Sequence, residues 1–369
     1  MITFNKAMEI VENNDAFYYK DEEHKGRKFR IFNYRLATYS DFNNDIDSLE
    51  LRGLTFELNS KGTKKPYLGL HKFFNDGENP FAMVEWDEND VLDVREKLDG
   101  SFIQVFYIGK DLYVKTKGTF KSKQALAAEE FILKNQNYIA FILKCKKYNL
   151  QPFFEYVSPF NQIVIPYEKS ELILTQIRTK DGEYLDYKRL KEFAEKFGLK
   201  IAKEYNYTLK KLRELQNSEK GFEGWVARNK KYPLKTQFRK VKTIDYFEKH
   251  HLLTGNAMQE NVIIASILNE NIDDIISTLP VNTEKRNYLE EIRNKVSHHY
   301  DKMVVELSKL LIYKKFNDRK DFALKHKNHP YFGVLMKARD EIEIENMLKE
   351  VILKRTQKLL NAKEFLKNI

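Results

Sequence analysis

The sequence of 369 residues contains a single cysteine, Cys145. One cysteine excludes a disulfide within the chain, and a thiolate zinc site is not expected. Long hydrophobic runs are also absent. No stretch of about 18 apolar residues occurs, and the first residues, MITFNKAMEIVENND, lack the continuous apolar segment of a signal peptide. We therefore expect a cytosolic protein that is not secreted and does not cross a membrane.

Glycine-rich loops that cradle phosphates are missing as well, because neither G-x-x-x-x-G-K-[ST] nor G-x-G-x-x-G occurs. Any chemistry on ATP must therefore use another device. One such device is a lysine that attacks the α-phosphate, forms a lysyl-AMP phosphoramidate and expels pyrophosphate. Neighbouring cations would activate this lysine, because they destabilise its ammonium form.

Positive charge is in excess, with 64 Lys and Arg against 54 Asp and Glu and a net charge of +10. This balance favours a polyanionic partner, since clustered cations release counterions from phosphates. Charge alone does not decide the question, because many basic proteins bind no nucleic acid.

The first two thirds of the chain, to about residue 245, alternate short β-rich runs with turns. These runs are RKFRIFNYRLATYS, SFIQVFYI, DLYVKTK, PFFEYV, LILTQIRT and EGWVARN. Gly109 to Asp111 separate two of them and predict a hairpin. In DYKRLKEFAEKFG, Asp186 can cap a helix that Gly198 ends. We therefore expect antiparallel sheets with interspersed helices over residues 1–245.

From about residue 246 helical periodicity replaces the β pattern. In the longest helical stretch the apolar residues recur at spacings of three, four and seven: Leu289, Ile292, Val296, Met303, Leu307 and Leu310. The predicted fold class is therefore α+β, with an antiparallel-sheet domain over 1–245 and an all-helical domain over 246–369.

The stretch KLDGS places Lys97 ahead of a tight Asp99-Gly100 turn, where backbone could approach a nucleotide. This is the local order that lysine nucleophile chemistry needs. The pattern K-x-D-G alone is weak, because it arises by chance in roughly one chain in ten of this length.

The span from Phe29 to Tyr246 resembles the phage-type RNA ligase 1 family, ATP-dependent RNA ligases of the covalent nucleotidyltransferase superfamily. The matching blocks occur in family order: RIFNY, LRGLTFEL, HKFFNDGENPF, KLDGS, YVKTKGTFKS, FFEYVSPFNQIV, LILTQIR, FEGWVAR and RKVKT. The resemblance implies a nucleotidyltransferase domain in which Lys97 is adenylylated. The ATP-binding residues that it implies are Tyr34, Arg52, Lys72, Lys117, Glu155, Lys240 and Lys242.

Two carboxylates carry specific roles in the resemblance. Glu155 would contact the ribose hydroxyls, and Glu223 would hold the catalytic Mg²⁺, since hard cations prefer carboxylate oxygens. The plain structural alternatives are an ion pair for Glu155, which lies in an apolar strand pattern and needs a partner, and a turn acid for Glu223. Arg52 and Lys72 would bind the triphosphate tail; as lone residues they would be surface cations.

Lys240 and Lys242 lie two apart in an extended stretch, so their side chains share one side of a sheet. This suits two charges on the α-phosphate and the departing pyrophosphate, and the resemblance makes Lys242 the cation that lowers the pKa of Lys97. The alternative is a basic edge strand. The tract before Lys240 is longer than in the family, so Lys235 is a rival for one of the two positions. Gln162 stands where relatives have Arg.

Asp273 and Asp274 resemble a metal-binding carboxylate pair of the family's helical domain. The pattern favours a simpler interpretation, an acidic first turn of a helix stabilised by the helix dipole. Phe74 is a candidate to stack on adenine.

The resemblance implies three steps: Lys97 takes AMP from ATP, AMP passes to an RNA 5′-phosphate, and an RNA 3′-hydroxyl displaces AMP. DNA ligases and capping enzymes place a β-rich domain after the last motif, whereas this chain becomes helical. That contrast favours an RNA ligase that acts on single-stranded or nicked-loop RNA, in the repair of RNA or tRNA. The resemblance further implies an end-healing kinase/phosphatase as a functional partner. It also implies that the protein works in a phage-infected bacterium. The alternatives are a DNA ligase and a non-catalytic RNA-binding protein on a ligase scaffold.

Overall fold

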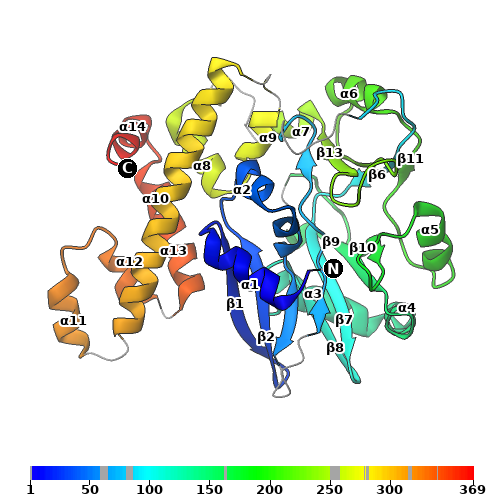
Figure 1. Cartoon of the computed structure of the whole chain (residues 1–369), viewed down its shortest axis with the longest axis horizontal. Helices are drawn as coiled ribbons and strands as arrows, with labels where there is room; N and C mark the ends of the chain where they lie inside the picture. The colour runs from blue at the N-terminus through cyan, green and yellow to red at the C-terminus, as the bar shows by residue number, and fades with distance from the viewer. Residues whose placement is uncertain are drawn as a thin grey trace. The chain divides into compact units, whose positions relative to one another are not determined.

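The computed structural model describes residues 2–58, 65–79, 86–161, 164–249, 258–277, 279, 282–314, 318–338 and 340–369. The backbone divides into two compact units, Met1–His250 and His251–Ile369 (Figure 1). The first unit mixes strands and helices, and the second is helical in its described part. The predicted α+β fold class is confirmed.

Three sheets build the first unit. The N-terminal sheet has the order β1-β2-β3-β4, from β1 (Phe17–His24), β2 (Arg27–Tyr34), β3 (Thr55–Leu58) and β4 (Pro66–Tyr67). The central sheet has the order β10-β9-β7-β8, from β7 (Ser101–Ile108), β8 (Asp111–Lys115), β9 (Gln151–Val157) and β10 (Glu171–Arg178). The third sheet has the order β11-β6-β12-β13-β5, from β5 (Phe74–Asn75), β6 (Asp93–Lys97), β11 (Glu204–Tyr205), β12 (Gly224–Arg228) and β13 (Phe238–Lys242).

The pairing of these strands is antiparallel except for β5 with β13, which is parallel. The predicted hairpin is confirmed: Ile108 pairs with Asp111, so Gly109 and Lys110 form its two-residue turn. The sequence pattern assigned Asp111 to the turn, whereas it is the first residue of β8.

The helices of the first unit are α1 (Phe4–Asn13), α2 (Tyr39–Asn44), α3 (Lys123–Lys134), α4 (Gln136–Lys147), α5 (Tyr187–Glu195), α6 (Leu209–Ser218) and α7 (Ile244–Lys249), with the short 3-10 helices η1 (Ile46–Leu51) and η2 (Pro159–Asn161). The cap predicted for α5 is present, because the Asp186 side chain accepts a hydrogen bond from the backbone N–H of Arg189.

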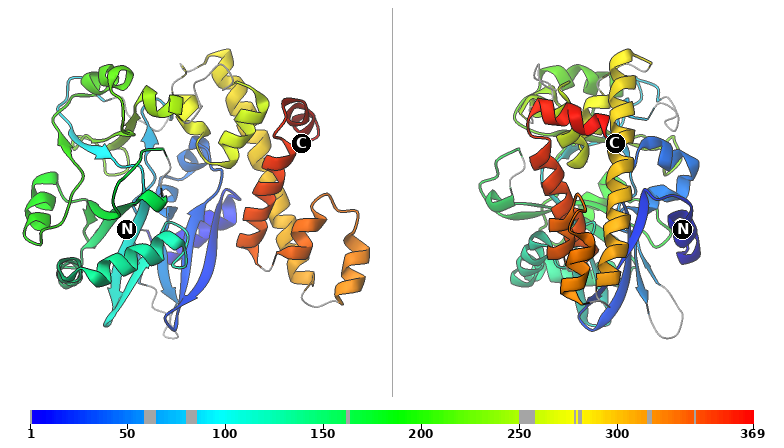
Figure 2. Two further views of the ribbon diagram at one scale, coloured as in Figure 1. Left: turned by 180° about the vertical axis from the view of Figure 1, so that it is seen from behind. Right: turned by 90° about the vertical axis from the view of Figure 1, so that its left-hand side faces the viewer.

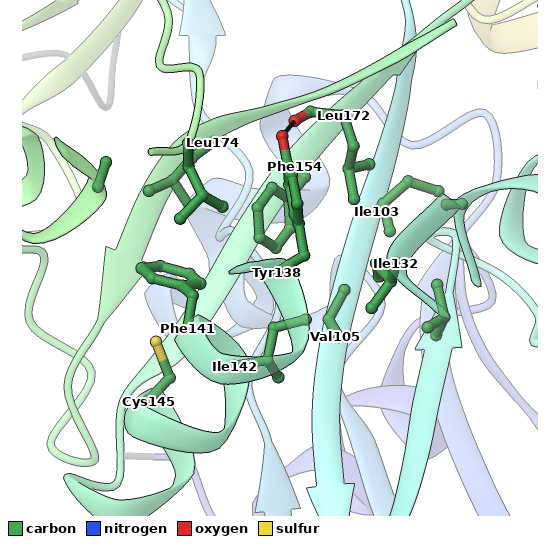
Figure 3. Packing of buried hydrophobic residues seen from close by; sticks show 14 of the residues in the cluster. Ile103, Val105, Ile132, Tyr138, Phe141, Ile142, Cys145, Phe154, Leu172 and Leu174 are labelled. Atoms are coloured by element: carbon green, nitrogen blue, oxygen red, sulfur yellow. Dashed lines mark hydrogen bonds between the residues drawn. The ribbon is translucent and has the colours of Figure 1, made fainter. Parts of the chain in front are cut away.

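Helices α3 and α4 cover one face of the central sheet, as the left-hand view of Figure 2 shows. Phe141, Ile142 and Cys145 of α4 pack on Ile103 and Val105 of β7 and their neighbours (Figure 3). The Tyr138 hydroxyl donates to the carbonyl of Leu172 at 2.7 Å. This buried hydroxyl therefore has a hydrogen-bond partner within the apolar cluster. This apolar layer fixes the strands that carry part of the site described below.

The second unit contains α8 (Glu260–Leu268), α9 (Ile272–Ser277), α10 (Glu284–Lys314), α11 (Arg319–His326), α12 (Phe332–Lys337), α13 (Glu341–Arg355) and α14 (Leu359–Lys367). Helix α10 contacts α8, α9, α12, α13 and α14, so it is the element around which the unit packs. None of the described helices is both long and apolar enough to cross a membrane.

The predicted apolar stripe of α10 is buried in part, at Leu289, Ile292, Val296 and Leu307. Val304 and Leu311 are buried, whereas Met303 and Leu310 are only partly buried. The reason is that polar residues belong to the buried face: Arg286, Arg293, Ser297 and Tyr300. A prediction from the spacing of apolar residues alone does not include these polar residues, so it identifies only part of the buried face of α10.

Candidate active site

The third sheet brings three predicted site residues into one row. Gly224 pairs with Lys97 on one side and with Lys242 on the other. Glu223, which directly precedes Gly224, contacts both amines: its Oε2 lies 2.7 Å from Nζ of Lys97 and its Oε1 lies 3.1 Å from Nζ of Lys242. One carboxylate therefore joins the two lysines across three strands.

Glu223 is 3% exposed. Burial acts to raise the pKa of its carboxyl group, but the charges of Lys97 and Lys242 outweigh burial and hold the pKa below its usual value. The residue is therefore ionised at neutral pH and serves as counterion to two lysines.

Two glycines are required by close backbone approach. A Cβ on Gly100 would lie 2.5 Å from the carbonyl oxygen of Tyr156, and one on Gly224 would lie 2.2 Å from that of Val241. Gly224 also has φ +145°, a conformation that side chains rarely adopt. The glycines of KLDGS and FEGWVAR thus allow the strands around Lys97 to pack at this distance.

Asp99 holds the turn that follows Lys97. Its side chain is 2% exposed and accepts hydrogen bonds from the backbone N–H groups of Val164 and Ile165, both at 2.7 Å, and from the Tyr246 hydroxyl at 2.9 Å. A carboxylate with three donors fixes its segment firmly. The Lys-x-Asp-Gly pattern therefore places Lys97 beside an anchored turn.

A cavity of about 310 Å³ opens beside Lys97. Five of the predicted site residues line it: Arg52, Lys97, Glu155, Lys240 and Lys242. The aromatic residues in its wall are Phe73, Phe102, Tyr184 and Phe238. A basic cavity with apolar walls suits a nucleotide, whose phosphates need cations and whose base needs apolar contact.

Glu155 comes from the central sheet, where it pairs with Phe102 of β7 and Ile173 of β10. It is partly buried. Burial raises the pKa of its carboxyl group to about 7, while Lys97 acts to lower it and Glu223 acts to raise it. Near neutral pH Glu155 can therefore either donate or accept a hydrogen bond.

Arg52 follows η1 and places its guanidinium 5.1 Å from the centre of the Phe102 ring. Its Nη1 is buried and has no hydrogen-bond partner among the residues that the structure describes. A buried donor without an acceptor costs about 1–3 kcal/mol. An anion bound in the cavity would supply the acceptor.

Tyr34, Lys72 and Lys117 form a second group outside the lining of the cavity. Nζ of Lys117 lies 4.8 Å and Nζ of Lys72 lies 5.9 Å from the centre of the Tyr34 ring. The backbone N–H of Lys72 donates to the carbonyl of Leu49 in η1, three residues before Arg52. The group is thus tied to the element that precedes Arg52.

Other candidates lie elsewhere. Lys235 forms an ion pair with Asp47 and does not line the cavity, unlike Lys240 and Lys242. Phe74 is 5% exposed and packs against Phe42 in the core of the N-terminal sheet, so the candidate for adenine stacking is not part of the cavity wall. Gln162 lies outside the described residues.

Asp273 and Asp274 lie in the first turn of α9, and Asp273 accepts a hydrogen bond from Arg293 at 2.9 Å. Within the described ranges, no group of three or more His, Cys, Asp or Glu could hold a metal ion. The geometry agrees with the acidic-turn interpretation, and metal binding by the pair stays a prediction.

Two buried interactions near the site had no clear signal in the sequence. Lys115 is fully buried, and its Nζ donates to the carbonyls of Gly53 and Lys117, each at 3.2 Å. Burial lowers its pKa to about 7. Arg178 forms a buried pair with Glu50 of η1 at 2.8 and 2.9 Å. Lys115 fixes the backbone at Gly53 and Lys117, and Arg178 fixes Glu50, two residues before Arg52. The only signal in the sequence was the alternation of Lys115 with Lys117, which indicates that the two side chains lie on the same side of a strand.

Comparison with known proteins identifies the family. The model of the RNA ligase family matches residues 50–250, more than half of the chain. The chain therefore belongs to the RNA ligase family, and the predicted enzyme class is confirmed.

Individual relatives are more distant. A protein of Thermovibrio ammonificans whose name assigns it to the RNA ligases is 29% identical over 317 residues, which cover 84% of this chain and 80% of that protein. An archaeal ATP-dependent RNA ligase is 10% identical with a TM-score of 0.47, covering 84% of this chain and 80% of that one. Naegleria gruberi RNA ligase with PPi is 17% identical with a TM-score of 0.37. That alignment covers 44% of this chain and 52% of the other, so this chain spans about half of the Naegleria gruberi protein.

Proposed function

We propose that this chain joins RNA 5′-phosphate and 3′-hydroxyl ends with ATP, through a lysyl-AMP intermediate on Lys97. The observation that carries the proposal is the position of Lys97, whose amine shares Glu223 with Lys242 at the wall of a basic cavity. Family membership supports the reaction class, and the position of Lys97 supports its role as the nucleophile.

In the first step, Nζ of Lys97 attacks the α-phosphorus of ATP. A P–N bond forms, the bond from the α-phosphorus to the bridging oxygen breaks, and pyrophosphate leaves with the electron pair. The amine must first leave Glu223 and release its proton to solvent. Lys240, Lys242 and Arg52 line the same cavity and would stabilise the charge that develops on the phosphates.

The remaining predicted residues take positions around the same nucleotide. Glu155 would contact the ribose hydroxyls, and the group of Tyr34, Lys72 and Lys117 would hold the triphosphate end. Glu223 is the carboxylate that would bind Mg²⁺ together with phosphate oxygens, because Mg²⁺ is usually held by one or two carboxylates and substrate phosphates. When bound, the ion would neutralise phosphate charge.

In the second step AMP passes from Lys97 to an RNA 5′-phosphate, and in the third an RNA 3′-hydroxyl displaces AMP to form the phosphodiester. The helical unit would contribute to the choice of RNA, with Asp273 and Asp274 as the acidic first turn of α9. A broken tRNA loop, healed at its ends by a separate kinase/phosphatase, is the substrate that the family resemblance favours.

The first test is retention of label on the polypeptide. Purified protein is mixed with Mg²⁺ and α-labelled ATP, denatured and separated. Label is expected on the wild type and on Lys235→Ala, a lysine that pairs with Asp47 outside the cavity lining, but not on Lys97→Ala. A wild type without label, or Lys97→Ala with undiminished label, would refute the mechanism.

The second test offers 5′-phosphorylated single-stranded RNA, single-stranded DNA and nicked duplex DNA in parallel. Joining of RNA is expected. Preference for the nicked duplex would identify a DNA ligase, and RNA binding without label or joining would identify a non-catalytic RNA-binding protein.

A further inference from the structure

Phe160 lies on η2, directly after the strand that carries Glu155, and its side chain is almost entirely in water. At 96% exposure it is the most exposed large hydrophobic residue in the described part of the chain. Exposure of an aromatic ring forgoes the stabilisation that burial gives. Single exposed apolar residues are common on proteins, so the surroundings of Phe160 must decide whether the ring has a role.

The turn that presents Phe160 is anchored on both sides. The backbone N–H of Phe160 donates to Oγ of Ser158 at 3.2 Å, and this hydroxyl is hydrogen-bonded to Ser170 at 2.8 Å. Nδ2 of Asn161 donates to Oγ of Ser101 at 3.0 Å and to the carbonyl of Tyr156 at 3.3 Å. The ring is therefore displayed by an ordered turn rather than by a loose loop end.

These anchors place the turn beside the nucleophile. Ser101 is the first residue of β7 and follows Lys97 by four residues, so their Cα atoms lie at most about 14 Å apart. Tyr156 directly follows Glu155, which lines the cavity. An RNA end held at Lys97 would thus have its next few nucleotides within reach of Phe160.

Positive charge lies on the adjacent segment. Nε2 of Gln124 in α3 donates to Oδ1 of Asn161 at 3.2 Å, which joins the beginning of α3 to the turn. Lys121 and Lys123, just before Gln124, are exposed, and neither forms a salt bridge with any residue that the structure describes. An aromatic ring on a turn that is hydrogen-bonded to a segment with two unneutralised lysines is complementary to a nucleotide, which has a flat base and a charged phosphate.

We propose that Phe160 is a stacking platform for an unpaired base of the RNA strand that lies next to the ligation site, with Lys121 and Lys123 holding the neighbouring phosphates. This proposal rests on the proposed function, because RNA is the polyanion that the site would act on. Stacking is tolerant of sequence, since every base has a flat face, so Phe160 would contribute affinity for single strands rather than a choice of base.

The test measures RNA binding by the full chain at a fixed salt concentration. The probe is a 5′-phosphorylated single-stranded oligoribonucleotide that carries 2-aminopurine near its end, and the readouts are its anisotropy and its quenching. Phe160→Ala is expected to weaken binding by about 5-fold to 100-fold and to reduce quenching, whereas Phe160→Trp retains both. Leu133→Ala, which removes a 55% exposed apolar side chain from α3, is the matched control and is expected to bind like the wild type.

Each outcome separates this proposal from the proposed function. Label from α-labelled ATP should remain on Phe160→Ala, because Phe160 does not line the cavity. Binding by Phe160→Ala within twofold of the wild type, or an equal loss in Leu133→Ala, would overturn the platform while the ligase assignment stands. Failure of the wild type to form lysyl-AMP would instead overturn the proposed function.

A second arm uses the lysines. The double variant Lys121→Ala/Lys123→Ala should weaken binding and reduce the dependence of affinity on salt, because fewer counterions are released. An unchanged salt dependence would show that these lysines do not contact phosphates and would overturn that half of the proposal.

Discussion

Glu155→Gln should stabilise the first unit at neutral pH. In the folded protein burial raises the pKa of Glu155 from 4.5 to about 7, so the ionised form is disfavoured by about 3 kcal/mol. Because Glu155 is partly exposed, we reduce this expectation to about 2 kcal/mol. Glutamine has nearly the same shape and cannot ionise, so the variant avoids this cost.

The sign of the pH dependence follows from the two pKa values. Below pH 4.5 Glu155 is protonated in both states, and its ionisation has no effect on stability. Between pH 4.5 and about 7 the folded state keeps a proton that the unfolded state has released, so stability falls as the pH rises. Above pH 7 the full cost is present. The advantage of the variant should therefore grow from near zero at pH 4.5 to about 2 kcal/mol at pH 8.

Urea unfolding followed by tryptophan fluorescence measures this difference, because both tryptophans, Trp86 and Trp225, are buried in the first unit. Glu195→Gln, at a residue of α5 whose side chain is 63% exposed, is the matched control and should show no pH-dependent gain. An advantage of Glu155→Gln that is absent at pH 8, or equal at pH 5 and pH 8, would refute the reasoning.

Three further substitutions test other parts of the site and fold. Gly100→Ala should cost about 1–3 kcal/mol in urea unfolding and reduce lysyl-AMP formation, because its Cβ would meet the Tyr156 carbonyl at 2.5 Å. Arg52→Met should raise the KM for ATP at least tenfold in the labelling assay with little loss of stability, because Nη1 has no partner among described residues. Asp186→Ala should cost about 1 kcal/mol by loss of a helix cap while label incorporation stays unchanged.

The sequence was most informative where the local conformation depends on a residue and its near neighbours in the chain. The hairpin at Gly109, the cap at Asp186 and the alternation of Lys240 with Lys242 each follow from local geometry, and the structure has all three. The order of the motifs identified the family. Local patterns sufficed here because backbone conformation and strand alternation are set by neighbours in the chain.

Pairings between distant segments were not accessible in the same way. Nothing local to Glu50 or Arg178 indicates that they pair, because they lie on η1 and β10 and are 128 residues apart in the sequence. The buried face of α10 was predicted only in part for a related reason, since Arg293 is buried against Asp273 of α9 and Arg286 donates to the carbonyl of Leu279. A buried charge requires its partner to be known, and a single sequence does not give the partner.

The active site collects groups that are each unfavourable to bury. Arg52 has a donor without an acceptor in the described part of the chain, Glu155 is costly to ionise, and Glu223 must neutralise two amines. The sheets around these residues pack on large apolar clusters, whose burial offsets the cost. ATP would give Arg52 an acceptor and would bring phosphate charge to Lys97 and Lys242, so that phosphate oxygens compete with Glu223 for the two amines. Binding of substrate should therefore favour release of the Lys97 amine from Glu223, which is the step that the proposed mechanism requires.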